Sequence, residues 1–280
     1  MYDYVGADGV LPLANGNYVV LSNRWDNGTI QDAGAITFGD GEGPLAGYVS
    51  ATNSLVGSSN GDAIGKWVTE LNNGHVVISS PYWDNGAVAD AGASTWCNGD
   101  TGCTGVITAS NSLVGSQATD RIAGNAITEL TNGDYVVSSA EWNNGAVADV
   151  GAITWVDGNT GLIGNVTPEN SLIGSSTNDW LGSGSVMALP NGNYVVRSPY
   201  WDNGLVANAG AVTLADAAGM VGAVSSANSL VGSTAEDLLG AGSFTALADG
   251  RYVLSSPNWN NGEYVDAGAV TLGSGSIPLS

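Results

Sequence analysis

The sequence predicts an all-β protein, a single five-bladed β-propeller whose blades are four-stranded antiparallel sheets. Two observations predict it: short phrases recur every 58 or 59 residues, and each copy carries a hairpin signal between β-rich segments. No segment has the 3.6-residue periodicity of an amphipathic helix. Repeated four-stranded sheets are typical of propeller blades, because a sheet of this kind is covered on both faces only by neighbouring sheets.

Three phrases define the repeat. The first is Asn-Gly or Asp-Gly followed by a tryptophan, the second is Gly-Ala-x-Thr, and the third is Asn-Ser-Leu-(Val/Ile)-Gly-Ser. The first two occur five times and the third occurs four times. The recurring tryptophans are Trp25, Trp83, Trp142, Trp201 and Trp259.

The third copy illustrates the expected elements in chain order. Strands are expected at 126–130, 135–139 and 151–156, and 161–166 begins the fourth. Asn132-Gly133 predicts a type I′ hairpin turn, which requires positive φ at both central residues. Trp142 opens a longer loop between the second and third strands. Four strands joined by hairpin-type connections make one blade.

One domain is expected over residues 1–280, with blades at 3–61, 62–119, 120–178, 179–236 and 237–280. The chain starts in phase with a whole blade, and its last copy stops at 277–280, early in strand four. We therefore expect the fifth blade to lack much of its outer strand. The alternatives are an open array of sheets and a β-solenoid, although solenoid coils are usually shorter than this unit and lack Asn-Gly hairpins.

Charge narrows the classes of partner. Lys and Arg total 5 against 26 Asp and Glu, giving a formal net charge of −21. Nucleic acid and anionic lipid are poor partners for such a chain, because both are bound by clustered cations. Glycans, basic protein surfaces and cations remain open as partners, and the charge also keeps a Gly-rich β protein in solution. We expect a monomer without a cofactor.

The cysteines and the targeting signals bear on the cellular compartment in which the protein works. Cys97 and Cys103 flank a Gly-rich turn, where they could form a disulfide across a hairpin or remain two free thiols. A disulfide would indicate an oxidising compartment. No signal peptide is visible at residues 1–7, and no apolar run reaches membrane-spanning length. The chain is therefore expected to be intracellular or the mature part of a longer protein.

The candidate ligand surface follows from the up-and-down order of the strands. The loop between strands two and three and the link to the next blade should lie on one face, which we call the loop face. The recurring tryptophans would stack there on sugars or other flat ligands, or would instead wedge between blades. The acids that follow three of them are candidates for the same surface: Asp26, Asp84 and Asp202.

Two further acidic sets recur on the loop face. Their oxygens could bind a cation or a polar ligand, or could accept loop backbone N–H groups, as Asp and Asn commonly do in turns. The second interpretation is favoured, because nearly every blade keeps them. The first set is Asp3, Asp62, Asp120, Asp179 and Asp237, and the second is Asp32, Asp90, Asp149 and Asp266, with Asn208 at the remaining position.

Blade-specific recognition is expected where the copies differ. The residue before the tryptophan varies among Arg24, Tyr82, Glu141, Tyr200 and Asn258. The tryptophans without a counterpart in every copy are expected to be packing residues: Trp67, Trp96, Trp155 and Trp180.

Enzymatic chemistry finds little support. His75 is the only histidine, so a metal site with two His ligands is impossible, and no Ser-His-Asp set is present. Acids abound, but nothing singles out a pair for glycoside hydrolysis. We expect no catalytic residues and no metal site.

The order of phrases resembles a known repeat. The run from Asp179 through Asn191-Gly192 and Ser198-Pro199 to Gly210-Ala211 is similar to FG-GAP repeats, which build the propeller of integrin α chains and of many bacterial surface proteins. The resemblance covers all five copies. Ser-Pro or Ser-Ser stands where that family has a Gly-Ala-Pro-like phrase, and its Phe-Gly is mostly absent. The family's calcium loop is replaced by a dipeptide, too short to wrap an ion that needs six to eight oxygens.

The resemblance implies a secreted or cell-surface module of bacterial type. We therefore expect a non-enzymatic binding or adhesion module, with its ligand surface on the loop face or in the central channel. The ligand would be a glycan or a protein. One alternative is a structural spacer, amplified or engineered from one blade, with no specific ligand. A glycan-active enzyme is the second alternative.

Overall fold

The computed structural model describes residues 3–43 and 45–276, and within them the chain is all β. They form 22 strands and no helix, arranged in five sheets, one for each repeat. This architecture is consistent with a five-bladed propeller. The described chain divides into two compact units, each of which is treated separately below.

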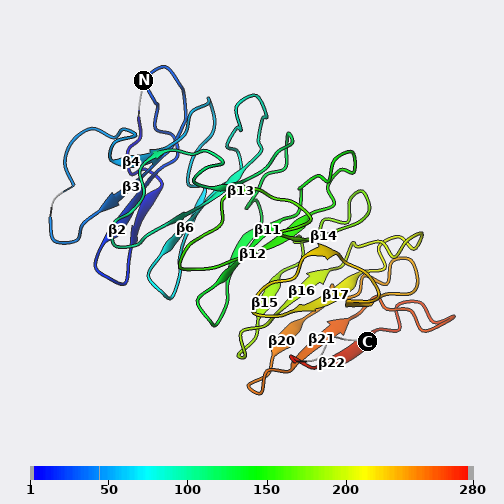
Figure 1. Ribbon diagram of the computed structural model, residues 1–280. Helices are drawn as coiled ribbons and strands as arrows, with labels where there is room; N and C mark the ends of the chain where they lie inside the picture. The colour runs from blue at the N-terminus through cyan, green and yellow to red at the C-terminus, as the bar shows by residue number, and fades with distance from the viewer. Residues whose placement is uncertain (1–2, 44, 277–280) are drawn as a thin grey trace. The chain divides into compact units, whose positions relative to one another are not determined.

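The first unit, Met1–Ile127 with Asp157–Asn165, contains the sheets of the first two repeats. Their strand orders are β1-β2-β3-β4-β8 and β13-β9-β7-β6-β5 (Figure 1). The strands are β1 (Gly9–Pro12), β2 (Tyr18–Ser22), β3 (Ala35–Gly39), β4 (Ser54–Val56), β5 (Trp67–Glu70), β6 (Val76–Ser80), β7 (Ala93–Cys97), β8 (Gly105–Val106), β9 (Leu113–Val114) and β13 (Gly164–Asn165).

The second unit, Thr128–Val156 with Val166–Ser280, contains the other three sheets. Their orders are β10-β11-β12-β14-β18, β15-β16-β17-β19 and β20-β21-β22. The strands are β10 (Ala126–Glu129), β11 (Tyr135–Ser139), β12 (Ala152–Val156), β14 (Leu172–Ile173), β15 (Val186–Ala188), β16 (Tyr194–Ser198), β17 (Ala211–Ala215), β18 (Gly222–Ala223), β19 (Ser229–Val231), β20 (Phe244–Ala246), β21 (Tyr252–Ser256) and β22 (Ala269–Gly273). The expected start of the fifth blade's outer strand, 277–280, lies outside the described residues.

The first three strands of each repeat fall where the sequence predicts them, but the fourth does not. In the third repeat the predicted segment 161–166 contains β13, which pairs in parallel with β9 of the preceding repeat. The repeat's own fourth strand is β14, antiparallel to β12. It belongs to the Asn-Ser-Leu phrase, which follows the predicted segment. Each of the first three sheets therefore gains a parallel fifth strand from the next repeat: β8, β13 or β18.

A buried hydroxyl pair explains why the Asn-Ser-Leu phrase forms the fourth strand. The Thr154 hydroxyl of the Gly-Ala-x-Thr phrase lies 2.7 Å from the Ser171 hydroxyl, and both side chains are buried. Equivalent pairs occur in the first, second and fourth repeats. A buried hydroxyl needs a partner, so the two phrases specify each other across strands three and four.

The hairpin between the first two strands is not the predicted type I′ turn. In the first repeat the Leu13 amide donates to Asn17 and the Gly16 amide donates to Leu13. Gly16 has φ of +92°, while Asn15 is not in the left-handed region. This is a three-residue loop, a type I turn followed by a left-handed glycine. The Asn-Gly dipeptide fits both loop types, because either one needs Gly at its last position.

The hydrophobic cores lie between successive sheets within each unit. In the first unit, Ile36 and Leu55 of the first sheet share a core with Val76 and Ile78 of the second. In the second unit, Val136 of the third sheet shares a core with Val196 of the fourth. Every residue of β6 and of β11 is buried. Within the second unit, the fourth sheet shares one core with the third sheet and another with the fifth, so it is covered on both faces, as the repeat predicts.

Candidate functional site

Four of the five recurring tryptophans are buried, which corrects the expectation that they form a ligand platform. Trp83, Trp142 and Trp201 are 3% exposed and Trp25 is 7% exposed. Trp83 packs in the core between the first two sheets, and Trp201 packs in the core between the third and fourth. Trp259 is half-buried against the core of the fifth repeat. The wedge interpretation therefore describes Trp83 and Trp201.

In the described chain the indole N–H groups of Trp83, Trp142 and Trp201 are buried without a hydrogen-bond partner. Trp25 differs from the other recurring tryptophans because it lines a pocket. This pocket of about 410 Å³ lies in the first repeat and is also lined by Asp26.

The acids after the tryptophans shape the loop. Asp26 accepts the amide N–H of the residue six positions on, at 2.9 Å, as do Asp84 and Asp202 at 2.9 and 2.8 Å. Asn143 and Asn260 accept the same bond through their amide oxygens. Since one carbonyl-type oxygen suffices, Asp and Asn interchange at this position. These contacts favour the turn-forming interpretation of all three acids.

The set that includes Asp32 has a backbone explanation. These five residues have φ between 49° and 52°. Asp and Asn tolerate the left-handed region better than other side chains with a Cβ. The position requires one of them for its conformation, which accounts for Asn208 in the fourth repeat.

The set that includes Asp179 ties successive repeats together. Asp179 is fully buried, and it accepts the amides of Ser175 at 2.6 Å and Ser176 at 2.8 Å in the link, and of Asp202 at 2.9 Å in the next loop. Burial raises the pKa of Asp179, because desolvation penalises the carboxylate more than these hydrogen bonds favour it. The pKa of Asp62 is raised for the same reason. Asp3, ahead of the first repeat, is exposed.

The links and the strand two-to-three loops meet, as predicted for the loop face. In the first unit the amides of Gly61 and Ala63 donate to the carbonyls of Gln31 and Asp32. Each Asp of the set that includes Asp179 is followed by a residue with φ of 43–45°, and none of these following residues is Gly, Asn or Asp. Such strain is characteristic of functional positions, and here the backbone repeats while the side chain changes. These residues are Tyr4, Ala63, Arg121, Trp180 and Leu238.

The variable loop-face positions of the first unit gather aromatic rings and cations. Lys66 Nζ lies 5.7 Å from the Tyr82 ring centroid and 5.9 Å from that of Trp67. The guanidinium carbon of Arg121 also lies 5.8 Å from the Tyr82 ring centroid. Each contact is a cation–π interaction, which restrains the cation, and Arg121 is also paired with the Asp90 carboxylate at 3.7 Å. We call this set the aromatic–cation patch: Tyr4, Arg24, Lys66, Trp67, Tyr82 and Arg121.

The aromatic–cation patch borders a pocket of about 530 Å³, which Tyr4, Arg24, Lys66 and Tyr82 line. Tyr4 and Trp67 are exposed, and Arg24 lies 5.9 Å from the Tyr4 ring. Three of the five cations in the chain lie in the patch. The patch thus offers stacking surfaces and N–H donors together, in a chain that is otherwise strongly acidic.

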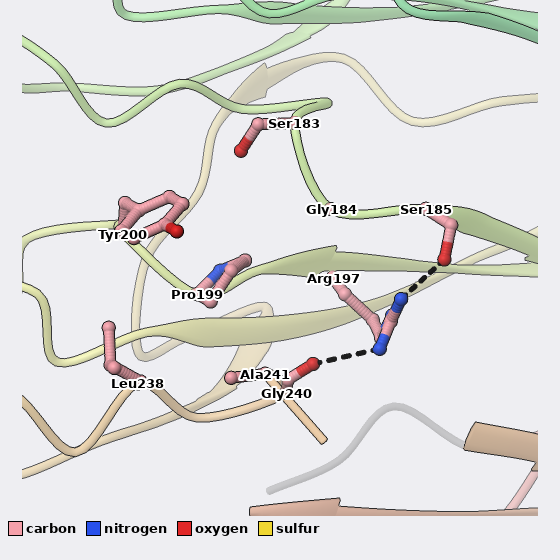
Figure 2. A pocket seen from close by; sticks show the side chains of 9 residues that line it. All are labelled: Ser183, Gly184, Ser185, Arg197, Pro199, Tyr200, Leu238, Gly240 and Ala241. Atoms are coloured by element: carbon pink, nitrogen blue, oxygen red, sulfur yellow. Dashed lines mark hydrogen bonds between the residues drawn. The ribbon is translucent and has the colours of Figure 1, made fainter. Parts of the chain in front are cut away.

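A second pocket, of about 410 Å³, lies between the fourth and fifth repeats. It includes Arg197, Tyr200 and Leu238, and we call it the Arg197 pocket (Figure 2). Tyr200 precedes the buried Trp201 as Tyr82 precedes Trp83. The rings of Tyr200 and Trp180 meet edge-to-face, with centroids 5.7 Å apart. The Arg197 pocket and the pocket beside the aromatic–cation patch occupy equivalent places in different repeats.

The face opposite the loop face, which carries the Asn-Gly hairpins, holds a set of packing contacts in the second repeat. Cys97 and Cys103 form a disulfide there, with Cα atoms 5.2 Å apart. His75 meets Trp96 edge-to-face at 4.8 Å, and its Nδ1 accepts the Gly99 amide at 3.3 Å. Trp96 in turn donates to the Gly158 carbonyl of the next repeat. These are packing contacts, as expected for Trp96.

Residues 3–43 and 45–276 hold no group of three or more His, Cys, Asp or Glu side chains placed to bind a metal. The same residues form no helix of the length and apolarity needed to span a membrane.

Sequence reasoning found part of this surface. The variable position before the tryptophan was singled out, and Arg24, Tyr82 and Tyr200 line the pockets. Trp67 and Trp180 were expected to pack, but both are exposed. Nothing in the sequence shows that Trp180 has a left-handed backbone. The only available signal was that the residue after the recurring Asp changes from repeat to repeat.

Comparison with sequence families gives one match. Residues 12–66, 70–124, 129–183, 188–241 and 246–280 match the family described as "Repeat of unknown function (DUF5650)". A search among curated proteins found no match to this sequence.

Comparison with solved structures gives distant similarities. One is a putative exo-beta-1,3-galactanase from Bifidobacterium bifidum s17, 11% identical, covering 96% of this chain and 85% of that one, with a TM-score of 0.35. Another is a streptogramin B lyase, 8% identical, covering 95% and 82%, with a TM-score of 0.31. A third is an endo-1,4-beta-xylanase from Bacteroides thetaiotaomicron VPI-5482, 11% identical, covering 98% and 97%, with a TM-score of 0.31. Similarities at this level carry no argument about activity.

Proposed function

The chain belongs to the DUF5650 repeat family, whose description assigns no function, and we propose from its own surface that it is a non-enzymatic module that binds carbohydrate. The observation that carries this proposal is the aromatic–cation patch on the loop face. Exposed rings give a pyranose a flat apolar surface for its C–H groups, and the cations beside them donate hydrogen bonds to its hydroxyls.

The pattern of variation supports a ligand surface rather than a repeated structural feature. The recurring residues are engaged in the fold: the tryptophan is buried in four repeats, four of the recurring Asp residues are buried, and the Thr–Ser pair forms in four repeats. The patch residues change between repeats on an unchanged backbone. A residue that the fold does not need, restrained beside a pocket, is a candidate for recognition.

A secreted or cell-surface location is part of the proposal. The Cys97–Cys103 disulfide supports it, because disulfides persist mainly in oxidising compartments. The resemblance to FG-GAP repeats supports an adhesion role. Two carboxylates line the patch pocket, Asp8 and Asp32, and Asp8 already accepts the Asn23 amide at 2.7 Å. This engagement favours binding over glycoside hydrolysis.

A glycan array followed by calorimetric titration of the best glycan tests the proposal. We expect binding by the wild type and at least a tenfold loss of affinity in Lys66→Ala/Tyr82→Ala, with the unfolding midpoint unchanged. Tyr264→Ala is the control, because Tyr264 is exposed and lines none of the pockets described above. Retained affinity in the double variant would remove the patch as the site. A blank array would overturn the proposed function and favour a structural spacer.

A further inference from the structure

We propose that the Arg197 pocket binds the carboxylate of an acidic sugar, with Arg197 as the residue that recognises it. This inference rests on the proposed function, since it names the chemistry of one unit of the glycan. It concerns a pocket distinct from the aromatic–cation patch, built by the fourth and fifth repeats alone.

Arg197 is a half-buried cation whose partners are all neutral. Its guanidinium donates to the carbonyls of Gly240 at 3.1 Å and Gly242 at 2.6 Å, and to the Ser185 hydroxyl; Figure 2 shows the Gly240 and Ser185 bonds. Within the described residues no carboxylate lies within ion-pair distance of it, although the chain has 26 acids. Burial lowers the pKa of Arg197, because desolvation penalises the cation. An added anion would supply the missing counter-charge through charge-assisted hydrogen bonds.

The fold does not require an arginine at this position. Arg197 is the fourth residue of β16, and the second strands of the other repeats form the same pairings without a cation. The residues at that position are Leu21, Ser79, Ser138 and Ser255. Burying half of a charged side chain costs folding free energy. Because the four equivalent strands have no charge at this position, the presence of Arg197 points to a role in binding.

The remaining walls suit a sugar. Tyr200 is exposed, and its ring is held perpendicular to that of Trp180, with an interplanar angle of 88°. Ser183 and Ser185 line the same pocket, and their hydroxyls can both donate and accept. The volume of about 410 Å³ lies within the range of small-ligand sites. One ring face, two hydroxyls and a guanidinium match the C–H face, the hydroxyls and the carboxylate of a uronic acid.

The charge of the chain selects a single acidic unit over a polyanion. At physiological ionic strength charges are screened beyond about 8 Å, so a carboxylate in contact with Arg197 interacts mainly with the pocket. A long polyanion would also lie against the rest of a surface whose net charge is −21. Its additional carboxylates would be repelled there. The expected ligand is therefore an isolated acidic sugar, such as a terminal residue of a glycan.

Two matched probes test the inference: methyl β-glucuronide and methyl β-glucoside, which differ only in having a carboxylate or a hydroxymethyl group at C6. Each is titrated into the full chain and followed by NMR at the Arg197 guanidinium and the Tyr200 ring. We expect the glucuronide to bind at least tenfold more tightly, which corresponds to about 1.4 kcal/mol.

Arg197→Ser should remove this preference while preserving the fold, because it restores the residue that three other repeats have. Arg251→Ser is the control: it makes the same charge change at an exposed residue paired with Asp249, and it should keep the preference. Equal affinities for the two probes, or a preference that survives Arg197→Ser, would overturn the inference. In that case a positive glycan array would still uphold the proposed function, whereas a blank array would remove both.

Discussion

The fourth and fifth repeats have the same third strand in opposite environments. Val212 and Leu214 of β17 are 0% and 7% exposed, and they share a core with Tyr252 and Leu254 of the next sheet. Val270 and Leu272 of β22, at the equivalent positions, are 76% and 56% exposed. The sequence of the strand is nearly unchanged, so burial comes from the following repeat. In the fourth repeat, one face of the sheet is therefore covered by the sheet of the fifth.

Residues that pack one repeat against the next are distinct from the residues proposed to bind the ligand. The recurring tryptophan and the buried Asp lie where one repeat meets the next, and their substitution should cost stability. The variable loop-face residues lie on the outside of that junction, and their substitution should cost binding. This division can be tested at the junctions on either side of the fourth repeat.

The largest effect is expected at Asp179, which joins the third repeat to the fourth. Asp179→Ala leaves three backbone amides without their acceptor, and should lower the free energy of unfolding by roughly 3 kcal/mol. Denaturant unfolding measures it. Asp3→Ala is the control, since Asp3 is exposed and should change stability by no more than about 0.5 kcal/mol. Equal losses in the two variants would show that the turn does not depend on the buried carboxylate.

A smaller effect separates the two equivalent valines. Val212→Ala removes buried methyl groups between two sheets and should cost about 2 kcal/mol, whereas Val270→Ala should cost no more than about 0.5 kcal/mol. Both values come from the same denaturant series. A loss at Val270 as large as that at Val212 would mean that the exposed face of the fifth repeat is covered in solution, which would break the comparison.

The smallest effect concerns the two Asp residues at those junctions. Burial raises the pKa of Asp179. Burial also acts to raise the pKa of Asp237, but hydrogen bonds from Thr234, Asn260 and Ser233 outweigh it, so the pKa is lowered. The Asp179 contribution to stability is therefore fully present below the ordinary Asp pKa and is lost as pH rises through the raised value. That of Asp237 is present above the ordinary pKa and is lost as pH falls through the lowered value.

Carboxyl carbon NMR titration of the folded chain measures this order directly. On acidification Asp179 should protonate before Asp237. The reverse order would show that the hydrogen bonds at Asp179 outweigh its desolvation, and that the two junctions do not differ as described.

The repeat spacing was enough to predict the number of sheets, the first three strands of each and the meeting of the loops. It placed the fourth strand wrongly, because 161–166 and the Asn-Ser-Leu phrase are both short and β-rich. Only the Thr154–Ser171 contact decides which of them pairs with β12. The predicted type I′ turn was wrong, because an Asn-Gly dipeptide fits a two-residue or a three-residue loop equally well.

The candidate site was less predictable than the fold. A recurring tryptophan such as Trp83 can face a ligand or the next repeat, and composition does not distinguish the two. Whether Trp67 and Trp180 are exposed depends on how the sheets stack and on a left-handed backbone at Trp180 that its side chain does not favour. The isolation of Arg197 from carboxylates likewise depends on tertiary placement. Variation between repeats was the one sequence signal that led to this surface.

The central claim is that variable loop-face residues bind the ligand while the recurring residues build the fold. Mapping backbone and side-chain NMR shifts on titration with a bound glycan tests it most directly. The account predicts that the largest shifts cluster at Tyr82, Lys66 and their neighbours in the aromatic–cation patch, with Asp84 and the buried Trp83 shifting less. Shifts centred on the recurring Trp-Asp-Asn-Gly loops, with the patch unmoved, would contradict it.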